Sequence, residues 1–230
     1  MADRGIQSNR YLFRIEGAES GGRWPVRVGR IFFIFRNKVL FVNRSVIPPL
    51  SKQRWIVILL LLACLVLSLI LRILPWFQMD FPALSVHGDP DVWYNFRQIE
   101  VMVSDFPRYN WFDPMTAYPV GKELDWGPLT PFLASLVCLL GGAAQLADIM
   151  AVSSWVPVVA GIAMIPVVFF LGRLIAGWKA GIIAAVFIAF VSGEYFYRTM
   201  AGIVDHHALE ILLSTLFCLF YLWALRKSSE

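Results

Sequence analysis

The sequence predicts an all-α integral membrane protein with about four membrane-spanning helices and a large first loop on the outer side. Of its 230 residues, 58% are hydrophobic and only 16% are charged, and the mean hydropathy is +0.65. A soluble globular domain carries roughly 45–50% apolar and about 25% charged residues. The composition therefore excludes a water-soluble enzyme and a disordered chain. Each of the three cysteines lies inside an apolar run, which offers neither a disulfide framework nor a zinc spacing.

Charge is distributed unevenly along the chain. Residues 1–54 hold eleven Lys and Arg against three acidic residues, whereas residues 78–128 hold eight acidic residues against three basic ones. A basic segment, an apolar run and an acidic loop, in this order, are typical of a cytoplasmic N-terminal segment followed by an outer loop. We expect no nucleic-acid partner for residues 1–54, because they contain no folded reader motif and arginines beside anionic lipid explain the charge.

Four apolar runs are long enough to predict membrane spans, since a spanning helix needs about 20 apolar residues. The predicted spans are residues 55–77, 149–171, 180–197 and 208–226. Near the end of the first span, Arg72 is expected to extend its guanidinium to the outer interface. The remaining chain is divided into cytoplasmic segments and outer loops, namely residues 1–54 and 172–179 inside and residues 78–148 and 198–207 outside.

A fifth apolar stretch, residues 129–146, is interpreted as an interfacial helix within the first outer loop. It contains a proline, a serine, two glycines and a glutamine, which suit an interface better than a span. If it crossed the membrane, Arg173, Lys179, Arg226 and Lys227 would all lie outside. Without that crossing these four residues lie inside, as the positive-inside rule favours. Both termini are then expected to be cytoplasmic.

The residues that carry chemistry gather in the two predicted outer loops. The first loop contains His87-Gly88-Asp89-Pro90-Asp91, and the second ends in Asp205-His206-His207. A carboxylate from the first loop with a carboxylate and an imidazole from the second would make a three-ligand cation site with open positions. In an extended segment Asp205 and His207 would face one side and His206 the other. The second loop therefore offers Asp205 and His207 as ligands, to be joined by one aspartate of the first loop.

Each of these residues also has a purely structural interpretation. Asp89 lies between glycine and proline, a setting typical of a turn or a helix cap. Asp205 precedes an apolar helix, and capping of that helix is the alternative to metal ligation. The histidine pair is typical of a solvated polar collar. An interfacial aromatic belt would account for Trp93, Tyr94, Trp111 and Trp126.

Taken together, the two motifs resemble those of oligosaccharyltransferase catalytic subunits. The segment Asp91-Val92-Trp93-Tyr94-Asn95-Phe96-Arg97 is similar to the family's Asp-Pro-Trp-Phe-Asn-Tyr-Arg in the first outer loop. Residues 201–207 resemble the second acidic motif, Asp-x-Asp/Glu, which is Asp-x-His in many archaeal members. Tyr118-Pro119-Val120-Gly121 also fits the family. The resemblance runs from about residue 55 to the C-terminus with matching order and spacing.

The resemblance implies a GT-C-type membrane glycosyltransferase that performs protein N-glycosylation. Such an enzyme transfers a glycan from a dolichol-phosphate or dolichol-pyrophosphate carrier to Asn in Asn-x-Ser/Thr. Position by position, it implies that Asp91 binds the metal and faces the acceptor amide, that Asp205 and His207 are metal ligands, and that Arg198 is important for activity. The implied cofactor is Mn²⁺ or Mg²⁺, with Zn²⁺ as the alternative. The implied partners are the lipid-linked oligosaccharide, the acceptor polypeptide and membrane lipids, with both motifs facing the exterior of the cell membrane.

Members of this family are several times longer than 230 residues. They carry a later outer loop with a catalytic glutamate and a soluble domain with a Trp-Trp-Asp-Tyr-Gly motif. We therefore expect the chain to be an N-terminal part that needs the C-terminal part of the enzyme and transfers no glycan alone. Two alternatives stay open: another polyprenyl-phosphate-sugar glycosyltransferase of GT-C type, whose acidic pair needs no metal, and a non-catalytic membrane scaffold.

Overall fold

The computed structural model describes residues 51–78, 90–124 and 126–228, which lie in one compact unit, Val42–Glu230. The predicted basic segment up to residue 50, together with His87 and Asp89, lies outside the described residues. The described part is mostly helical, which confirms the predicted fold class. Its helices are α1 (Ser51–Ile73), the 3-10 helix η1 (Leu74–Gln78), α2 (Pro90–Ser104), α3 (Leu129–Leu140), α4 (Leu146–Ser153), α5 (Trp155–Ala176), α6 (Trp178–Phe190), α7 (Glu194–Tyr197) and α8 (His207–Ser228).

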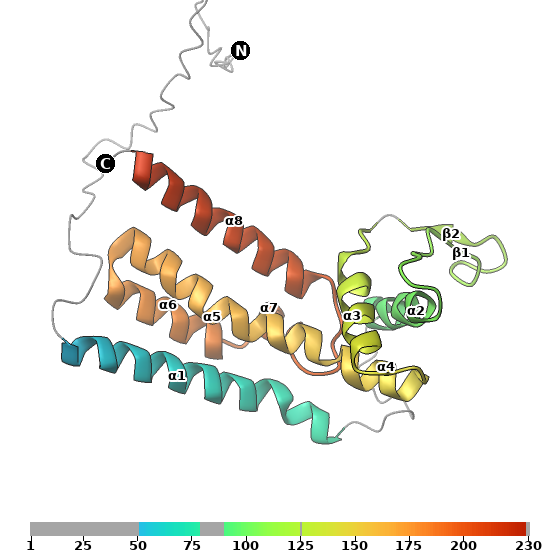
Figure 1. Cartoon of the computed structure of the whole chain (residues 1–230), viewed down its shortest axis with the longest axis horizontal. Helices are drawn as coiled ribbons and strands as arrows, with labels where there is room; N and C mark the ends of the chain where they lie inside the picture. Colours follow the sequence, from blue (N-terminus) through green and yellow to red (C-terminus); the bar gives the residue numbers. More distant parts are fainter. Residues whose placement is uncertain (1–50, 79–89, 125, 229–230) are drawn as a thin grey trace, which may run out of the picture. The chain divides into compact units, whose positions relative to one another are not determined.

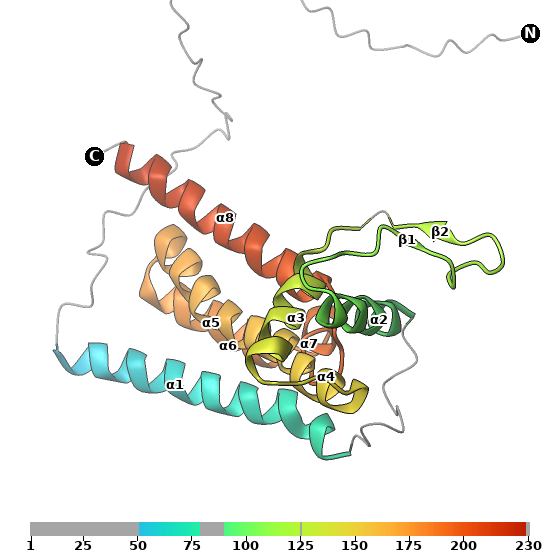
Figure 2. The same ribbon diagram turned by 45° about the vertical axis from the view of Figure 1, so that its right-hand side comes forward.

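The long helices α1, α5, α6 and α8 lie side by side, with α5 in contact with the other three (Figures 1 and 2). Helices α2, α3 and α4 gather at one end of this group, where α1 ends and α8 begins. Helices α5 and α6 approach closely because a glycine on α6, Gly181, faces the backbone of α5. A Cβ at Gly181 would lie 2.6 Å from the carbonyl oxygen of Phe169. Such small-residue contacts are typical of helices that pack within membranes.

Three helical stretches are long and apolar enough to cross a membrane: Gln53–Phe77, Leu146–Ala176 and His207–Ser228. They correspond to three of the four predicted spans. The remaining one, predicted over residues 180–197, is divided in the structure, because Val191-Ser192-Gly193 separates α6 from α7. With 13 residues, α6 is about 20 Å long, whereas the hydrocarbon core of a bilayer is about 30 Å thick.

The predicted interfacial stretch 129–146 contains the short helix α3. Its 12 residues give a length of about 18 Å, too short to cross a bilayer alone. The helix ends at a glycine pair, and Gly142 adopts a φ of +72° that favours glycine. Between α2 and α3, a two-stranded antiparallel sheet pairs β1 (Phe112–Asp113) with β2 (Lys122–Glu123). The sequence analysis did not predict this hairpin, because its strands are only two residues long.

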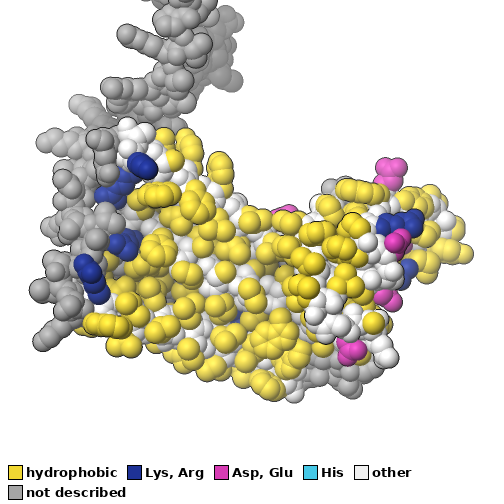
Figure 3. Space-filling model, viewed as in Figure 1, with side chains coloured by type: hydrophobic (Ala, Val, Ile, Leu, Met, Phe, Trp, Pro, Cys, Tyr) yellow, Lys and Arg dark blue, Asp and Glu magenta, His cyan; other side chains and the backbone are white. Residues whose placement is uncertain are grey.

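Charged side chains gather at the two ends of the long helices, separated by an apolar band (Figure 3). Lys and Arg cluster where α1 begins and α8 ends, whereas Asp and Glu, together with some Lys and Arg, are found around α2 and the hairpin. Within the basic end, Arg226 of α8 donates a hydrogen bond to the carbonyl of Leu174 on α5 at 3.3 Å. An apolar band between two charged ends is the surface expected of a membrane-embedded helix bundle.

Arg72, near the end of α1, is fully buried. The expectation that its side chain reaches the outer interface is wrong. The reason is that the bundle supplies acceptors inside: the guanidinium donates to the hydroxyls of Ser68 and Thr199 and to the carbonyl oxygen of Ala189. Hydrogen bonds of Nε and Nη1 to these acceptors offset part of the cost of burying the cation.

Candidate active site

The first motif forms the N-terminal turn of α2. Pro90 occupies the first position, where its fixed φ and missing N–H suit a helix start, and Asp91 lies in the first turn. The Asn95 side chain donates a hydrogen bond to the carbonyl of Asp91 at 2.8 Å. One face of the helix, carrying Val92, Phe96 and Ile99, is buried. The burial of that face fixes the turn on which Asp91 sits.

The second motif forms the segment between α7 and α8. Gly202 turns the chain with a φ of +88°, and Asp205 precedes the first turn of α8. The Asp205 Oδ1 atom accepts a hydrogen bond from the backbone N–H of His207 at 3.2 Å. The capping interpretation of Asp205 is therefore confirmed. Its carboxylate is also fully buried, a setting that needs compensating donors or cations.

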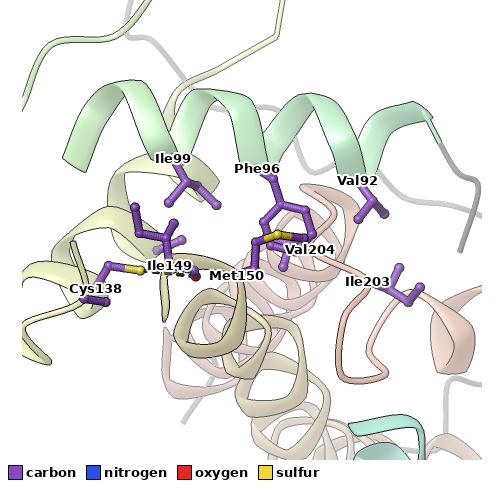
Figure 4. Packing of buried hydrophobic residues seen from close by; sticks show 10 residues of the cluster. Val92, Phe96, Ile99, Cys138, Ile149, Met150, Ile203 and Val204 are labelled. Carbon is purple, nitrogen blue, oxygen red and sulfur yellow. Dashed lines mark hydrogen bonds between the residues drawn. The ribbon is translucent and has the colours of Figure 1, made fainter. Parts of the chain in front are cut away.

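The two motifs meet in one hydrophobic cluster. Val92 from α2 lies in the same buried cluster as Ile203 and Val204 from the second segment (Figure 4). A series of contacts between aromatic rings connects the two motifs a second time. Trp126 contacts Tyr94 of α2 edge-on, with ring centroids 4.5 Å apart, and lies parallel to His206 at 6.3 Å. Both motifs therefore lie at the same end of the bundle, although more than a hundred residues separate them in the chain.

Charged groups surround the Asp205 carboxylate. Arg198 forms an ion pair with Oδ2 through Nη1, and its Nε donates to Glu194 at 2.6 Å. His206 Nδ1 lies 3.0 Å from Oδ1. His207 is turned toward Glu210, with Nδ1 2.8 Å from that carboxylate. Both oxygens of Asp205 thus have positive or donor partners, which explains how the carboxylate is accommodated without solvent.

The structure brings two of the three expected ligands, Asp205 and His207, together with His206. Ligand atoms of Asp205, His206 and His207 all lie within 4.8 Å of one another, and Asp91 is not a member of this group. The expectation that His206 faces away is wrong: the two imidazole centroids are 4.2 Å apart. The segment turns into α8 at His206 instead of remaining extended, so the alternation of an extended chain does not apply. One carboxylate and two imidazoles form a donor set that suits manganese, iron or zinc.

Sequence reasoning assigned no site role to several residues that the structure places there. Trp126 was assigned to an aromatic belt, but it stacks on His206. Glu210 and Glu194 complete the charged group around Arg198 and the histidines. The spacing of Glu210, three and four residues after the histidines on a helix, is the signal that could have identified it.

Comparison with known proteins agrees with this geometry. The family model described as "Oligosaccharyl transferase STT3, N-terminal" matches residues 50–230 of the chain. The chain belongs to the STT3 oligosaccharyltransferase family.

Curated relatives of this STT3-family chain are named as oligosaccharyl- or glycotransferases. "Dolichyl-phosphooligosaccharide-protein glycotransferase 3" of Archaeoglobus fulgidus is 35% identical over 160 residues, covering 69% of this chain and 18% of the relative. The Saccharomyces cerevisiae "Dolichyl-diphosphooligosaccharide--protein glycosyltransferase subunit STT3" is 31% identical over 162 residues, covering 63% of this chain and 21% of the relative. The chain thus spans about a fifth of the length of these relatives and is homologous to their N-terminal region.

Solved structures of an Archaeoglobus fulgidus oligosaccharyltransferase share the fold of this STT3-family chain. The apo form aligns with a TM-score of 0.69 at 30% identity, covering 77% of this chain and 20% of that one. A form with Zn and sulfate aligns with a TM-score of 0.64 at 32% identity, covering 72% and 21%. A form tethered to an acceptor peptide with the NVT sequon gives 0.68 at 30% identity, covering 76% and 21%. The STT3-family chain is therefore a multi-pass membrane protein with the expected GT-C-type fold.

Proposed function

We propose that this chain forms the metal- and acceptor-binding N-terminal part of an oligosaccharyltransferase. The complete enzyme would transfer a glycan from a dolichyl phosphate or pyrophosphate carrier to the side-chain amide of Asn in Asn-x-Ser/Thr. The observation that carries the proposal is the convergence of the two motifs: α2 presents Asp91 at the end of the bundle where Asp205 is buried beside two histidines. The relatives bearing dolichol-phosphate and an acceptor peptide in their solved structures support these two substrate classes.

The donor set around Asp205 fits a divalent cation. Asp205, His206 and His207 already bring one oxygen and two nitrogen atoms into a small volume, and we assign Asp91 as the ligand from the first motif. Mn²⁺, Mg²⁺ or Zn²⁺ bound there would supply Lewis-acid stabilisation of the charge on the departing phosphate. The homologous structure in complex with Zn and sulfate supports the binding of a divalent cation.

Asp91 and Arg198 have distinct proposed tasks. An amide nitrogen is a poor nucleophile because its lone pair is delocalised into the carbonyl. A carboxylate at Asp91 that accepts N–H bonds from the acceptor amide would orient it and weaken that delocalisation. The guanidinium of Arg198 holds Asp205, and its fork of donors matches the geometry of a phosphate. The two residues would thus bind the two substrates at one site.

We expect both motifs to face the exterior of the cell membrane, because the basic end of the bundle is the end farthest from them. Single cysteines at Lys122→Cys and Lys227→Cys, in a chain whose three native cysteines are replaced by alanine, test this orientation. A membrane-impermeant maleimide should label intact cells at position 122 and reach position 227 only after permeabilisation. Labelling of position 227 in intact cells would contradict the proposed orientation.

Manganese binding tests the proposed ligands. In lipid nanodiscs, titration of Mn²⁺ followed by electron paramagnetic resonance should give saturable binding. Asp205→Ala, His206→Ala and His207→Ala should each weaken the affinity at least about tenfold, as loss of a metal ligand or its partner does.

His87, which precedes the first motif in the chain, lies outside the described residues and serves as the control. His87→Ala should change the affinity less than twofold if the ligands are those assigned. Equal binding by wild type and Asp205→Ala would contradict the metal assignment and favour a metal-independent glycosyltransferase of similar architecture.

A further inference from the structure

We infer that Arg72 is a positioning residue that fixes the segment carrying Arg198 and Asp205 in place. The inference rests on the proposed function of that segment. It starts from an unusual observation: a fully buried arginine lies within a stretch that is long and apolar enough to span the membrane. Ionisable groups at such positions are costly and mark functional sites by default.

The contacts of Arg72 lead directly to the second motif. Its Nε donates a hydrogen bond to Thr199 Oγ1 at 3.0 Å, and its own carbonyl accepts one from the N–H of Ala201 at 2.9 Å. Thr199 follows Arg198 in the chain, and both Thr199 and Ala201 are fully buried. One residue of α1 therefore holds the start of the segment through both its side chain and its backbone.

The remaining contacts fix the guanidinium itself. Its Nη1 donates to Ser68 Oγ and, at 3.2 Å, to the carbonyl oxygen of Ala189 at the end of α6. The Phe196 ring of α7 lies under the guanidinium carbon, 4.4 Å from it to the ring centroid. Among the described residues, the hydrogen-bond acceptors around this cation are hydroxyl and carbonyl oxygens, so no carboxylate competes with Thr199 for it.

Helix α5 closes the remaining side of this contact. A Cβ at Gly161 would lie 2.6 Å from Arg72 Nε and 2.7 Å from Thr199 Cβ, which leaves no space for any other residue. Nearby, the Tyr195 hydroxyl of α7 donates a hydrogen bond to the carbonyl oxygen of Ala160 on α5 at 3.5 Å.

These contacts join four helices to one short segment. Thr199 Oγ1 also donates to carbonyls of α7, at 2.9 Å to Tyr195 and 3.0 Å to Phe196, so the hydroxyl connects α7 with α1. Arg198, directly before it, forms the ion pair with Asp205. Without the Arg72 guanidinium, Thr199 would lose a hydrogen bond that holds it in place. Arg198, the preceding residue, could then shift relative to the buried Asp205 carboxylate.

Hydrogen exchange and Mn²⁺ affinity of the full chain in lipid nanodiscs test this inference. Arg72→Met removes the guanidinium, Thr199→Val removes the hydroxyl that accepts its Nε–H while keeping the side-chain volume, and Gly161→Ala forces the two groups apart. Each should raise amide exchange within residues 198–207 and weaken Mn²⁺ binding about tenfold to a hundredfold, the cost typical of losing support behind a metal ligand. Arg72→Lys should behave much like Arg72→Met in both measurements, because an ammonium cannot reproduce the several donors of a guanidinium.

Gly172→Ala is the matched control. It also adds a methyl group to α5, 3.1 Å from the Cα of Gly181 on α6, but it makes no contact with the second motif. It should lower the melting temperature while leaving exchange in residues 198–207 and Mn²⁺ affinity within twofold of wild type. The inference is overturned if Thr199→Val or Gly161→Ala leaves that exchange as it is in Gly172→Ala.

The exchange result separates this inference from the proposed function. If wild type and Asp205→Ala bind Mn²⁺ equally, the proposed metal site fails. The positioning role of Arg72 is then still decided by exchange in residues 198–207 alone, which requires no bound metal.

Discussion

Replacing Arg198 with glutamine should lower the free energy of unfolding of the metal-free chain by about 3–5 kcal/mol. The Asp205 carboxylate is fully buried, and Arg198 is the permanently charged group paired with it. Removing one partner of a buried ion pair leaves an uncompensated charge, which costs far more than the pair contributes. Thermal or denaturant unfolding in detergent, in the presence of EDTA, measures the loss.

Mn²⁺ should reverse much of this loss, because a bound cation supplies the positive charge that glutamine lacks. Ligand binding to the folded state stabilises it in proportion to the logarithm of its concentration over Kd. The stability gained on adding Mn²⁺ should therefore be larger in Arg198→Gln than in wild type.

Arg97→Gln provides the control for the Arg198 substitution. It breaks an arginine–carboxylate pair on α2 with Glu100 at 3.1 Å, in which both side chains are exposed. An exposed pair contributes about 0–1 kcal/mol, so this variant should unfold almost as wild type does, with the same gain from Mn²⁺. Equal losses in the two variants would show that Asp205 does not depend on Arg198.

The helical membrane-protein class and three long apolar helices could be predicted from the sequence because they follow from length and hydropathy alone. Runs such as residues 55–77 and 208–226 are apolar throughout, and a helix is the structure that satisfies their backbone in lipid. The division of residues 180–197 depends on the local signal Ser192-Gly193, which is too weak to outweigh an otherwise apolar run. The orientation of Arg72 depends on two hydroxyls. One belongs to Thr199, more than a hundred residues away, and the other to Ser68, one turn earlier on α1.

Asp205 and His207 could be singled out from the sequence, whereas their grouping with His206 could not. The pairing of an acidic motif at Asp91 with one at Asp205 stays a prediction that rests on motif type and order. The direction of the His206 ring depends on where α8 begins, because alternation in a strand and rotation in a helix place neighbouring side chains differently. Trp126 joins the two motifs only through tertiary packing, which no local pattern encodes.

Truncating Trp126 to alanine should destabilise the chain by about 3 kcal/mol, the lower end of the range for buried aromatic residues. Its ring contacts Tyr94 and His206 and lies 5.8 Å from the Lys122 ammonium. Its backbone carbonyl also accepts a hydrogen bond from the Tyr109 hydroxyl at 3.2 Å. Because the ring spans the gap between the motifs, its loss should also weaken Mn²⁺ binding about tenfold.

Trp111→Ala is the matched control for Trp126. Trp111 is 61% exposed and contacts the Tyr109 ring edge-on at 4.8 Å, away from both motifs. We expect a change in stability below about 1 kcal/mol and unaltered Mn²⁺ affinity. Trp126→Phe should retain most of the ring contact. Its stability and Mn²⁺ affinity should therefore lie between those of Trp126→Ala and Trp111→Ala. If both alanine variants behave alike, Trp126 is only part of an interfacial belt.

The proposed site requires that Asp91 and Asp205 bind one cation, and the Mn²⁺ affinity of Asp91→Asn tests this most directly. Glu100→Gln makes the same change in charge on the same helix, at an exposed position paired with Arg97, and so corrects for long-range electrostatics. We predict that Asp91→Asn weakens Mn²⁺ binding at least about tenfold, while Glu100→Gln changes it less than twofold. Equal affinities in Asp91→Asn and Glu100→Gln would contradict a shared site, and the first motif would then have no part in holding the metal.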